Sequence, residues 1–217
     1  PARGPEALAP IKGSQVYLGN YFVPDVLNTV FLNPEYRHAL TDEWRLMFGV
    51  QYWNQRSVGS ELIGNFSTWQ AGARAEVGWR GLTFLAMMSA TGADAGIRSP
   101  YGGWPGYISL LETDFNLANE KAWEIGVTYD WGGTTFKALR APGLWTSLLY
   151  AEGFSVKATA QSVAVGKRRE ADLFNVWRPA QVPGFQFRTL FSLIQQDPQS
   201  RLYYDIRLIM DFEVPLL

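Results

Sequence analysis

Polar and apolar side chains alternate residue by residue over long stretches of this chain, and this alternation restricts its fold more than any other feature. Residues 69–79 put tryptophan, alanine and valine on one side. The other side holds Gln70, Gly72, Arg74, Glu76 and Gly78. Neighbouring side chains of a strand point to opposite faces of its sheet, so this segment predicts a strand with one polar and one apolar face. The same pattern recurs at residues 45–52, 123–131, 185–194 and 204–213.

About ten segments carry strand signals, and no segment favours an amphipathic helix instead. They span roughly residues 15–23, 29–39, 44–53, 68–79, 82–91, 122–131, 144–152, 170–178, 185–194 and 202–213. We therefore expect an all-β fold and a single domain over residues 1–217.

The connections between these segments tend to alternate in length. Tight links are expected at residues 40–43, 80–81 and 179–184, and long ones at 54–67, 92–121 and 153–169. Short turns at one end and long loops at the other are typical of outer-membrane barrels. Two connections depart from this pattern, because 132–143 is long for a periplasmic turn and 195–201 is short for an outer loop.

The spacing of tryptophans distinguishes a membrane barrel from a soluble sandwich, which alternates in the same way. Trp69 and Trp79 lie ten residues apart on one face, which corresponds to roughly 33 Å of strand and about 25 Å of height at a tilt of about 40°. That height matches the apolar band of an outer-membrane barrel with tryptophans at both interfaces. The sequence therefore predicts a transmembrane antiparallel up-and-down β-barrel, and a soluble β domain remains the alternative.

Composition excludes several other classes of protein. The chain has no cysteine and one histidine, His38, which leaves no ligand set typical of a zinc site. A formal net charge of -1 provides no basic field for nucleic acid. No stretch approaches the ~20 consecutive apolar residues of a membrane helix, so spanning segments must be strands. We expect no cofactor, no metal and no nucleic-acid partner.

Several segments resemble the OprD family of outer-membrane porins. They read QYWNQRSVG at residues 51–59, TWQAGA at 68–73, IRSPYGGWPGY at 97–107, DFN at 114–116 and EKAW at 120–123. Taken together, these runs are specific for that family. The likeness extends from about residue 15 to the end of the chain and identifies it with the C-terminal part of such a porin.

The resemblance implies a barrel of about 18 strands in the outer membrane of a Gram-negative bacterium. It also implies passive diffusion of small polar solutes such as amino acids and other carboxylates, contact with outer-membrane lipid, and a monomer or loose trimer. This sequence supplies about ten strands and begins Pro-Ala-Arg-Gly-Pro. We expect a part of such a barrel lacking its N-terminal strands, and a complete smaller barrel is the alternative.

Charged residues on the polar faces are candidates for lining the pore. The basic ones are Arg45, Arg74, Arg188 and Arg207, and the acidic ones are Glu76, Asp114, Glu124 and Asp205. The resemblance places Arg188 and Arg207 at or beside a ladder of basic side chains that guides carboxylates. Leu190 and Leu149 stand where that ladder would continue. The alternative is that these charges pair across strands, with Arg74 and Glu76 as the clearest pair.

Residues 92–121 are too rich in aromatic and apolar side chains for a freely solvated tip. We expect this loop to fold into the barrel mouth and to narrow it through Arg98, Tyr101, Trp104 and Tyr107. Asp114 would then lie near the constriction as a partner for a solute's ammonium group. A surface lid or protein-contact loop is the alternative.

Two other functions are alternatives to a porin. A structural or adhesion barrel with a plugged lumen would also fit the strand pattern. A barrel hydrolase would need a histidine with a partner at the extracellular rim, whereas His38 lies beside an expected periplasmic turn and is better placed as an interfacial side chain. We therefore expect no enzymatic activity.

Overall fold

The alternating segments form the strands of one antiparallel sheet. The computed structural model describes residues 6–8, 11–99, 106–134, 137–159 and 163–213. Its strands are β1 (Glu6–Leu8), β2 (Ser14–Val23), β3 (Leu27–Ala39), β4 (Trp44–Ser57), β5 (Ser67–Trp79), β6 (Leu82–Thr91), β7 (Lys121–Asp130), β8 (Leu144–Phe154), β9 (Arg168–Trp177), β10 (Phe185–Gln196) and β11 (Gln199–Phe212). The ten strands β2 to β11 coincide with the predicted segments within a few residues, and β1 adds a short edge strand.

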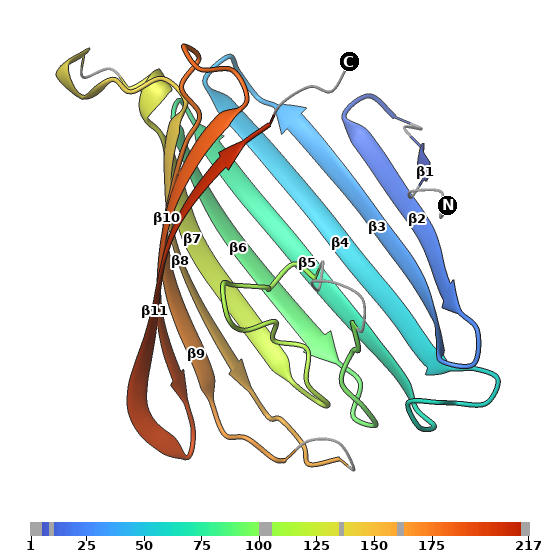
Figure 1. Ribbon diagram of the computed structural model, residues 1–217. Coiled ribbons are helices and arrows are strands. Elements are labelled where there is room, and N and C mark those ends of the chain that lie inside the picture. Colours follow the sequence, from blue (N-terminus) through green and yellow to red (C-terminus); the bar gives the residue numbers. More distant parts are fainter. Residues whose placement is uncertain (1–5, 9–10, 100–105, 135–136, 160–162, 214–217) are drawn as a thin grey trace.

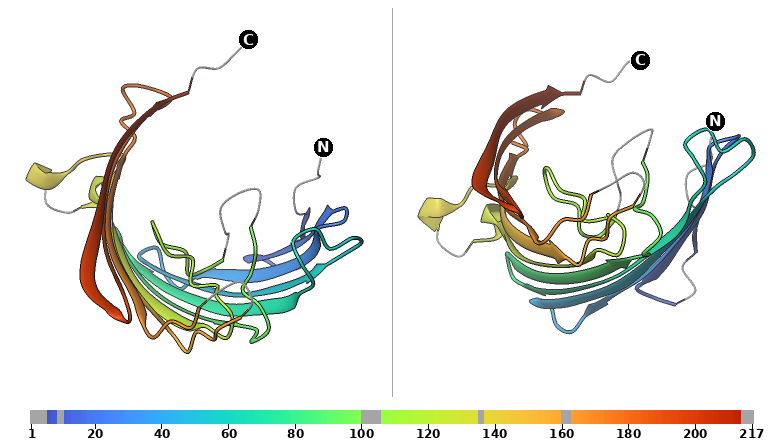
Figure 2. Two further views of the ribbon diagram at one scale, coloured as in Figure 1. Left: turned by 60° about the horizontal axis from the view of Figure 1, so that its bottom comes forward. Right: turned by 90° about the horizontal axis from the view of Figure 1, so that it is seen from below.

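Each strand pairs with the next one along the chain, so the topology is up-and-down. The order in the sheet runs from β1 to β11 without a crossover. Figure 2 shows that the sheet curves into a trough, with the edge strands on opposite rims. Among the described residues β11 is not paired with β1 or β2. The sheet is therefore open, as expected for part of a larger barrel.

The two faces of the sheet differ in polarity as the alternation predicts. On β5 the outward Trp69 is 41% exposed, whereas the neighbouring Gln70 is 3% exposed. The same contrast follows β4, where Phe48 and Val50 are exposed and Gln51 is buried. We call the concave, polar face the lumen face. The convex face carries the exposed apolar side chains, which suits contact with lipid.

Aromatic residues mark both ends of the apolar band. Trp44 and Trp79 stack with ring centroids 5.9 Å apart at the ends of β4 and β5. At the opposite end of the strands, the rings of Trp123 and Tyr150 lie 5.4 Å apart. Two such belts are typical of the lipid-water interfaces. No helix in the described ranges is long and apolar enough to span a bilayer.

Short and long connections are segregated to opposite ends of the strands (Figure 1). The short-turn end holds residues 40–43, 80–81 and 178–184, together with 131–143, which contains the 3-10 turns η1 (Trp131–Gly133) and η2 (Lys137–Leu139). The long-loop end holds 58–66, 92–120 and 155–167, along with the short links 24–26 and 197–198. The expected loop 54–67 is shorter than predicted, because β4 and β5 stay paired as far as Arg56 and Ser67.

A charge at the centre of the convex face should destabilise the protein. Ala73 lies midway along β5 on this face, so Ala73→Arg would place a guanidinium in hydrocarbon. We expect a loss of about 2–4 kcal/mol in the free energy of unfolding, measured by urea titration in lipid vesicles. Ala73→Leu is the matched control and should change stability little. Equal stability of both variants would mean that this face does not contact lipid.

Candidate functional site

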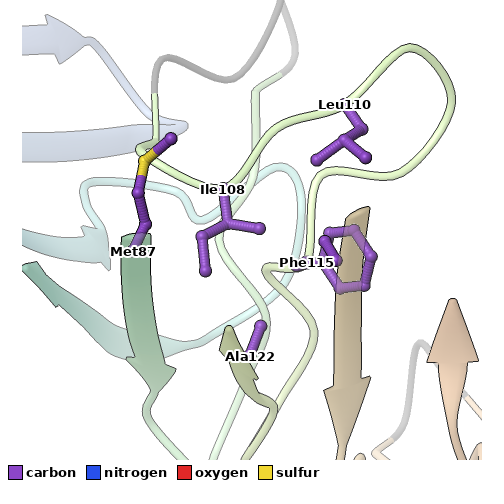
Figure 3. Close-up of a cluster of buried hydrophobic side chains, with 6 residues drawn as sticks. Met87, Ile108, Leu110, Phe115 and Ala122 are labelled. Atoms are coloured by element: carbon purple, nitrogen blue, oxygen red, sulfur yellow. The ribbon is translucent and has the colours of Figure 1, made fainter. Parts of the chain in front are cut away.

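Residues 106–120 of the loop between β6 and β7 lie over the lumen face (Figure 2). Their side chains join an apolar cluster with the strands below (Figure 3). The cluster consists of Met87, Ile108, Leu110, Phe115, Ala122 and Ala151. Three of these residues belong to β6, β7 and β8 and lie on the lumen face. Burial of apolar surface therefore holds the loop against the wall.

Tyr107 attaches the loop to the β3 and β4 side of the trough. Its main-chain N–H donates to the side-chain oxygen of Gln51 at 3.1 Å, and its hydroxyl donates to Asn33 Oδ1 at 2.5 Å. Burial, with a smaller contribution from Glu35, raises the pKa of Tyr107 to about 12, so its hydroxyl stays protonated as a donor. A side chain at Gly49 would collide with this hydroxyl. Glycine at position 49 therefore makes room for the tyrosine.

Buried carboxylates of β9 hold the opposite side of the loop. The main-chain N–H of Leu111 donates to Asp172 Oδ2 at 2.9 Å, and that of Glu112 donates to Glu170 Oε1 at 2.8 Å. Both carboxylates belong to fully buried residues on the lumen face. The side chain of Glu112 also pairs with Arg207 of β11. The loop thus spans the trough from β3 to β11.

Arg98 secures the beginning of the loop against residues 58–66. Its main-chain N–H donates to Gln55 Oε1 at 2.8 Å, and its Nη1 donates to the carbonyl oxygen of Ile63 at 2.6 Å. The guanidinium carbon lies 3.7 Å from the ring centroid of Phe66. Burial lowers the pKa of Arg98. The structure therefore places Arg98 at the root of the loop.

Glu120 and Arg168 secure the end of the loop. Glu120 is fully buried and accepts from Arg168 Nη1 at 2.9 Å and from the main-chain N–H of Leu117 at 2.9 Å. Burial raises the pKa of the Glu120 carboxyl, against the opposing effect of the arginine. Since Arg168 opens β9 and Glu120 precedes β7, this pair connects the loop to a strand that is not adjacent to it in sequence.

The candidate pore arginines of β5, β10 and β11 each contact a carboxylate. Arg74 pairs with Glu76 of its own strand, as the alternation suggested. Arg188 donates to Asp211 at 2.8 Å.

Arg207 donates to Asp205 at 2.6 Å, in addition to its pair with Glu112. Leu190 and Leu149 both face the lumen in register with these strands, Leu190 opposite Arg207 and Leu149 opposite Gly126. The arginines are therefore present on the lumen face but largely neutralised.

The other candidates lie at separate points of the lumen. Glu124 is 2% exposed and sits on the lumen face of β7. Asp114 belongs to the loop and accepts from the hydroxyl of Ser109 at 2.8 Å. Arg45 lies at the short-turn end of β4 and donates to the carbonyl oxygen of Arg80 at 3.3 Å. Tyr101 and Trp104 fall outside the described residues.

His38 lies on the convex face next to the turn at residues 40–43. Its ring is 6.0 Å from that of Tyr36, and Nδ1 is 3.3 Å from the tyrosine hydroxyl. No group of three or more acidic, histidine or cysteine residues in the described ranges is arranged to hold a metal ion. His38 is thus located where an interfacial side chain was expected.

Sequence reasoning missed the residues that anchor the loop. Among them are Asn33, Glu112, Glu120, Arg168, Glu170 and Asp172. Period-two alternation assigns the strand residues of this set to the lumen face. It carries no information on which loop atoms they bond, because the partners are distant in sequence.

Comparison with known proteins identifies related sequences and structures. Residues 12–214 match the sequence model of a family, described as "outer membrane porin, OprD family". A comparison with curated proteins found no match.

Solved structures from Pseudomonas and Acinetobacter share the fold. OpdK of Pseudomonas aeruginosa, determined with vanillate, matches with a TM-score of 0.78 and 20% identity over 92% of this chain and 52% of its own. OccAB3 of Acinetobacter baumannii matches with a TM-score of 0.83 and 16% identity, covering 95% and 53% of the two chains. OprD of Pseudomonas aeruginosa matches with a TM-score of 0.82 and 19% identity, covering 95% and 57%. The chain thus spans about half the length of these solved proteins.

A larger side chain at Gly49 should detach the loop from β4. In Gly49→Val the added atoms would occupy the place of the Tyr107 hydroxyl. We expect cleavage by added protease within residues 106–120 to become about tenfold faster than in the wild type, because the detached conformation of the loop becomes more populated. Cleavage sites and rates are measured by mass spectrometry.

Gly78→Ala is the matched control, since Gly78 also faces the lumen and an added Cβ there makes only ordinary contacts. Its loop should stay as resistant as that of the wild type. Resistance of the Gly49→Val loop would show that Tyr107 does not hold it.

Proposed function

We propose that this chain, which belongs to the OprD family of outer membrane porins, forms part of the wall of a passive channel for small polar solutes. Porins of this family are channels in the outer membrane of Gram-negative bacteria. The described sheet is open and would supply one side of the lumen.

The loop that spans the trough is the observation that carries this proposal. Residues 106–120 are fixed to the wall at both sides, by Tyr107 on one and by the carboxylates of β9 on the other. A segment held in this way narrows a lumen at a defined height, and pore width then selects solutes by size. We propose Arg98 as an anchor of this constriction and Tyr107 as part of its lining.

Carboxylate-bearing solutes, including amino acids, are the class that we propose for this channel. Arg188 and Arg207 support it, because a guanidinium binds a carboxylate in a bidentate pair. Vanillate, present in one solved relative, is itself a carboxylate. The carboxylates beside both arginines weaken this preference. Asp114 is the proposed acidic counterpart for an ammonium group, and Glu124 is proposed only as an acidic residue of the lumen face. The assembled porin is proposed to be a monomer or loose trimer.

Removing part of the loop should enlarge the channel. Deletion of residues 99–110 takes away Tyr107 and its bonds to Asn33 and Gln51. Single-channel conductance of the porin purified from outer membranes should rise about twofold or more, because conductance follows the narrowest cross-section. Deletion of residues 137–140, which lie at the short-turn end, is the control and should leave the conductance unchanged. Unchanged conductance after the first deletion would rule out a constriction.

Liposome swelling separates a channel from a plugged barrel. Vesicles containing the purified porin should swell in isotonic solutions of glycine or a small sugar. A structural barrel with a plugged lumen would give no swelling until the loop is shortened. Absence of swelling with every small solute in the wild type would contradict the proposed channel.

Substitution of Arg207 should affect the loop more than selectivity. Arg207→Gln removes the partner of Glu112 but also frees Asp205, so the net charge of the lumen changes while a loop anchor is lost. We expect single-channel current noise to increase and the preference for anions to fall by about twofold or less. Arg188→Gln, whose partner Asp211 is not part of the loop, should leave the noise unchanged.

A further inference from the structure

Lysine, arginine and glutamate occur on the convex face of the described residues of β2 to β11 only near the long-loop end. They are Arg56 on β4, Lys121 on β7, Glu152 on β8 and Arg169 on β9. At the short-turn end the same face holds His38 and aromatic side chains such as Trp44 and Trp79. Positive charge is therefore concentrated at one end of the face that suits contact with lipid.

The register of β7, β8 and β9 places most of these charges side by side. Trp123 is paired with Glu152, which is in turn paired with Arg169. Lys121 lies two residues before Trp123 on the same face, so it is a diagonal neighbour of Glu152. The rings of Trp123 and Tyr150 lie next to these charges on the side of the bilayer centre. The charges thus lie just outside the aromatic belt, at the height of lipid headgroups.

Glu152 holds two cations next to each other at this place. Its Oε1 accepts from Lys167 Nζ at 2.8 Å, and its Oε2 accepts from Arg169 Nε at 3.0 Å. Arg169 Nη1 also donates to Gln195 Oε1 at 3.2 Å and lies 3.7 Å from Asp197 Oδ1. Because Glu152 carries a single negative charge, it orients both cations without neutralising both.

The basic patch, by which we mean Lys121, Lys167 and Arg169, keeps donors for a ligand. The side chain of Lys167 is 49% exposed and that of Arg169 is 27% exposed. Lys121 is exposed, and its side chain has no bonding partner in the described part of the chain. The three cations outnumber the two neighbouring carboxylates, Glu152 and Asp197, so the patch has a net positive charge.

We infer that the basic patch binds the phosphate of a lipid headgroup in the leaflet at the long-loop end, which is the outer leaflet in outer-membrane barrels. Arginine and lysine bind phosphate oxygens through charge-assisted hydrogen bonds, and basic clusters beside a bilayer attract anionic lipids. Cations that only extend from hydrocarbon into water are expected at both ends of the strands, whereas here they lie at one. This inference concerns the lipid-facing wall and goes beyond the proposed solute channel.

Native mass spectrometry tests the inference on the porin purified from outer membranes in detergent. Phosphatidate and phosphatidylcholine with the same acyl chains are added in equal amounts, and the ratio of the two bound lipids is measured. We expect the wild type to favour phosphatidate by about fivefold or more. Lys121→Gln should lower this ratio about twofold, and Lys121→Gln combined with Lys167→Gln should bring it close to one. Lys137→Gln is the matched control, because Lys137 is an exposed lysine at the short-turn end.

A second double variant separates loss of charge from loss of structure. Lys121→Arg combined with Lys167→Arg keeps both charges and should keep the preference for phosphatidate. A preference that falls in the glutamine variants, but not in the arginine variant or in Lys137→Gln, supports the headgroup site. Equal binding of the two lipids by the wild type, or a ratio that both glutamine variants leave unchanged, overturns the site and does not affect the proposed channel.

Discussion

The requirement that every main-chain polar group be hydrogen-bonded inside hydrocarbon governs this structure. A meander of strands meets it by pairing each strand with its sequence neighbour, and the pleat then assigns alternate side chains to lipid and to the lumen. The contrast between Trp69 and Gln70 follows directly from this arrangement. Because the backbone needs no side chain for its hydrogen bonds, the lumen face is free to hold the groups that position the loop.

Lumen side chains perform that task by replacing the water that loop atoms would otherwise bond. Asp172 and Glu170 accept from consecutive main-chain N–H groups of the loop, and Gln51 accepts from another. Buried polar groups are tolerated when they are bonded in this way. The apolar cluster around Phe115 buries further apolar surface between the bonds to Asp172 and Glu170 on one side of the loop and the bond to Gln51 on the other. Loop position is therefore set by the wall, and a change in the wall alters the pore.

The strands and their faces could be predicted from the sequence, whereas the partners of the lumen side chains could not. Period two is a local property, so residues 68–79 are sufficient to predict β5 and to place Arg74 beside Glu76. The pair of Glu112 with Arg207 joins residues 95 positions apart. Whether they meet depends on how far the sheet curves, which no local pattern encodes. The strand number also follows from local patterns, since the sequence predicts about ten strands and the sheet runs from β1 to β11 with both edges unpaired in the described residues.

Pairing with carboxylates weakens the attraction of the lumen arginines for anionic solutes. An arginine already bonded to a carboxylate, such as Arg188, attracts an incoming anion weakly because the field of the pair falls off quickly with distance. A solute carboxylate must then displace a carboxylate of the wall to gain a bidentate contact. Arg45 imposes no such exchange, since its partner is a neutral carbonyl. Attraction of an anion to this wall therefore depends on which arginines lack a carboxylate partner, as Arg45 does in the described residues.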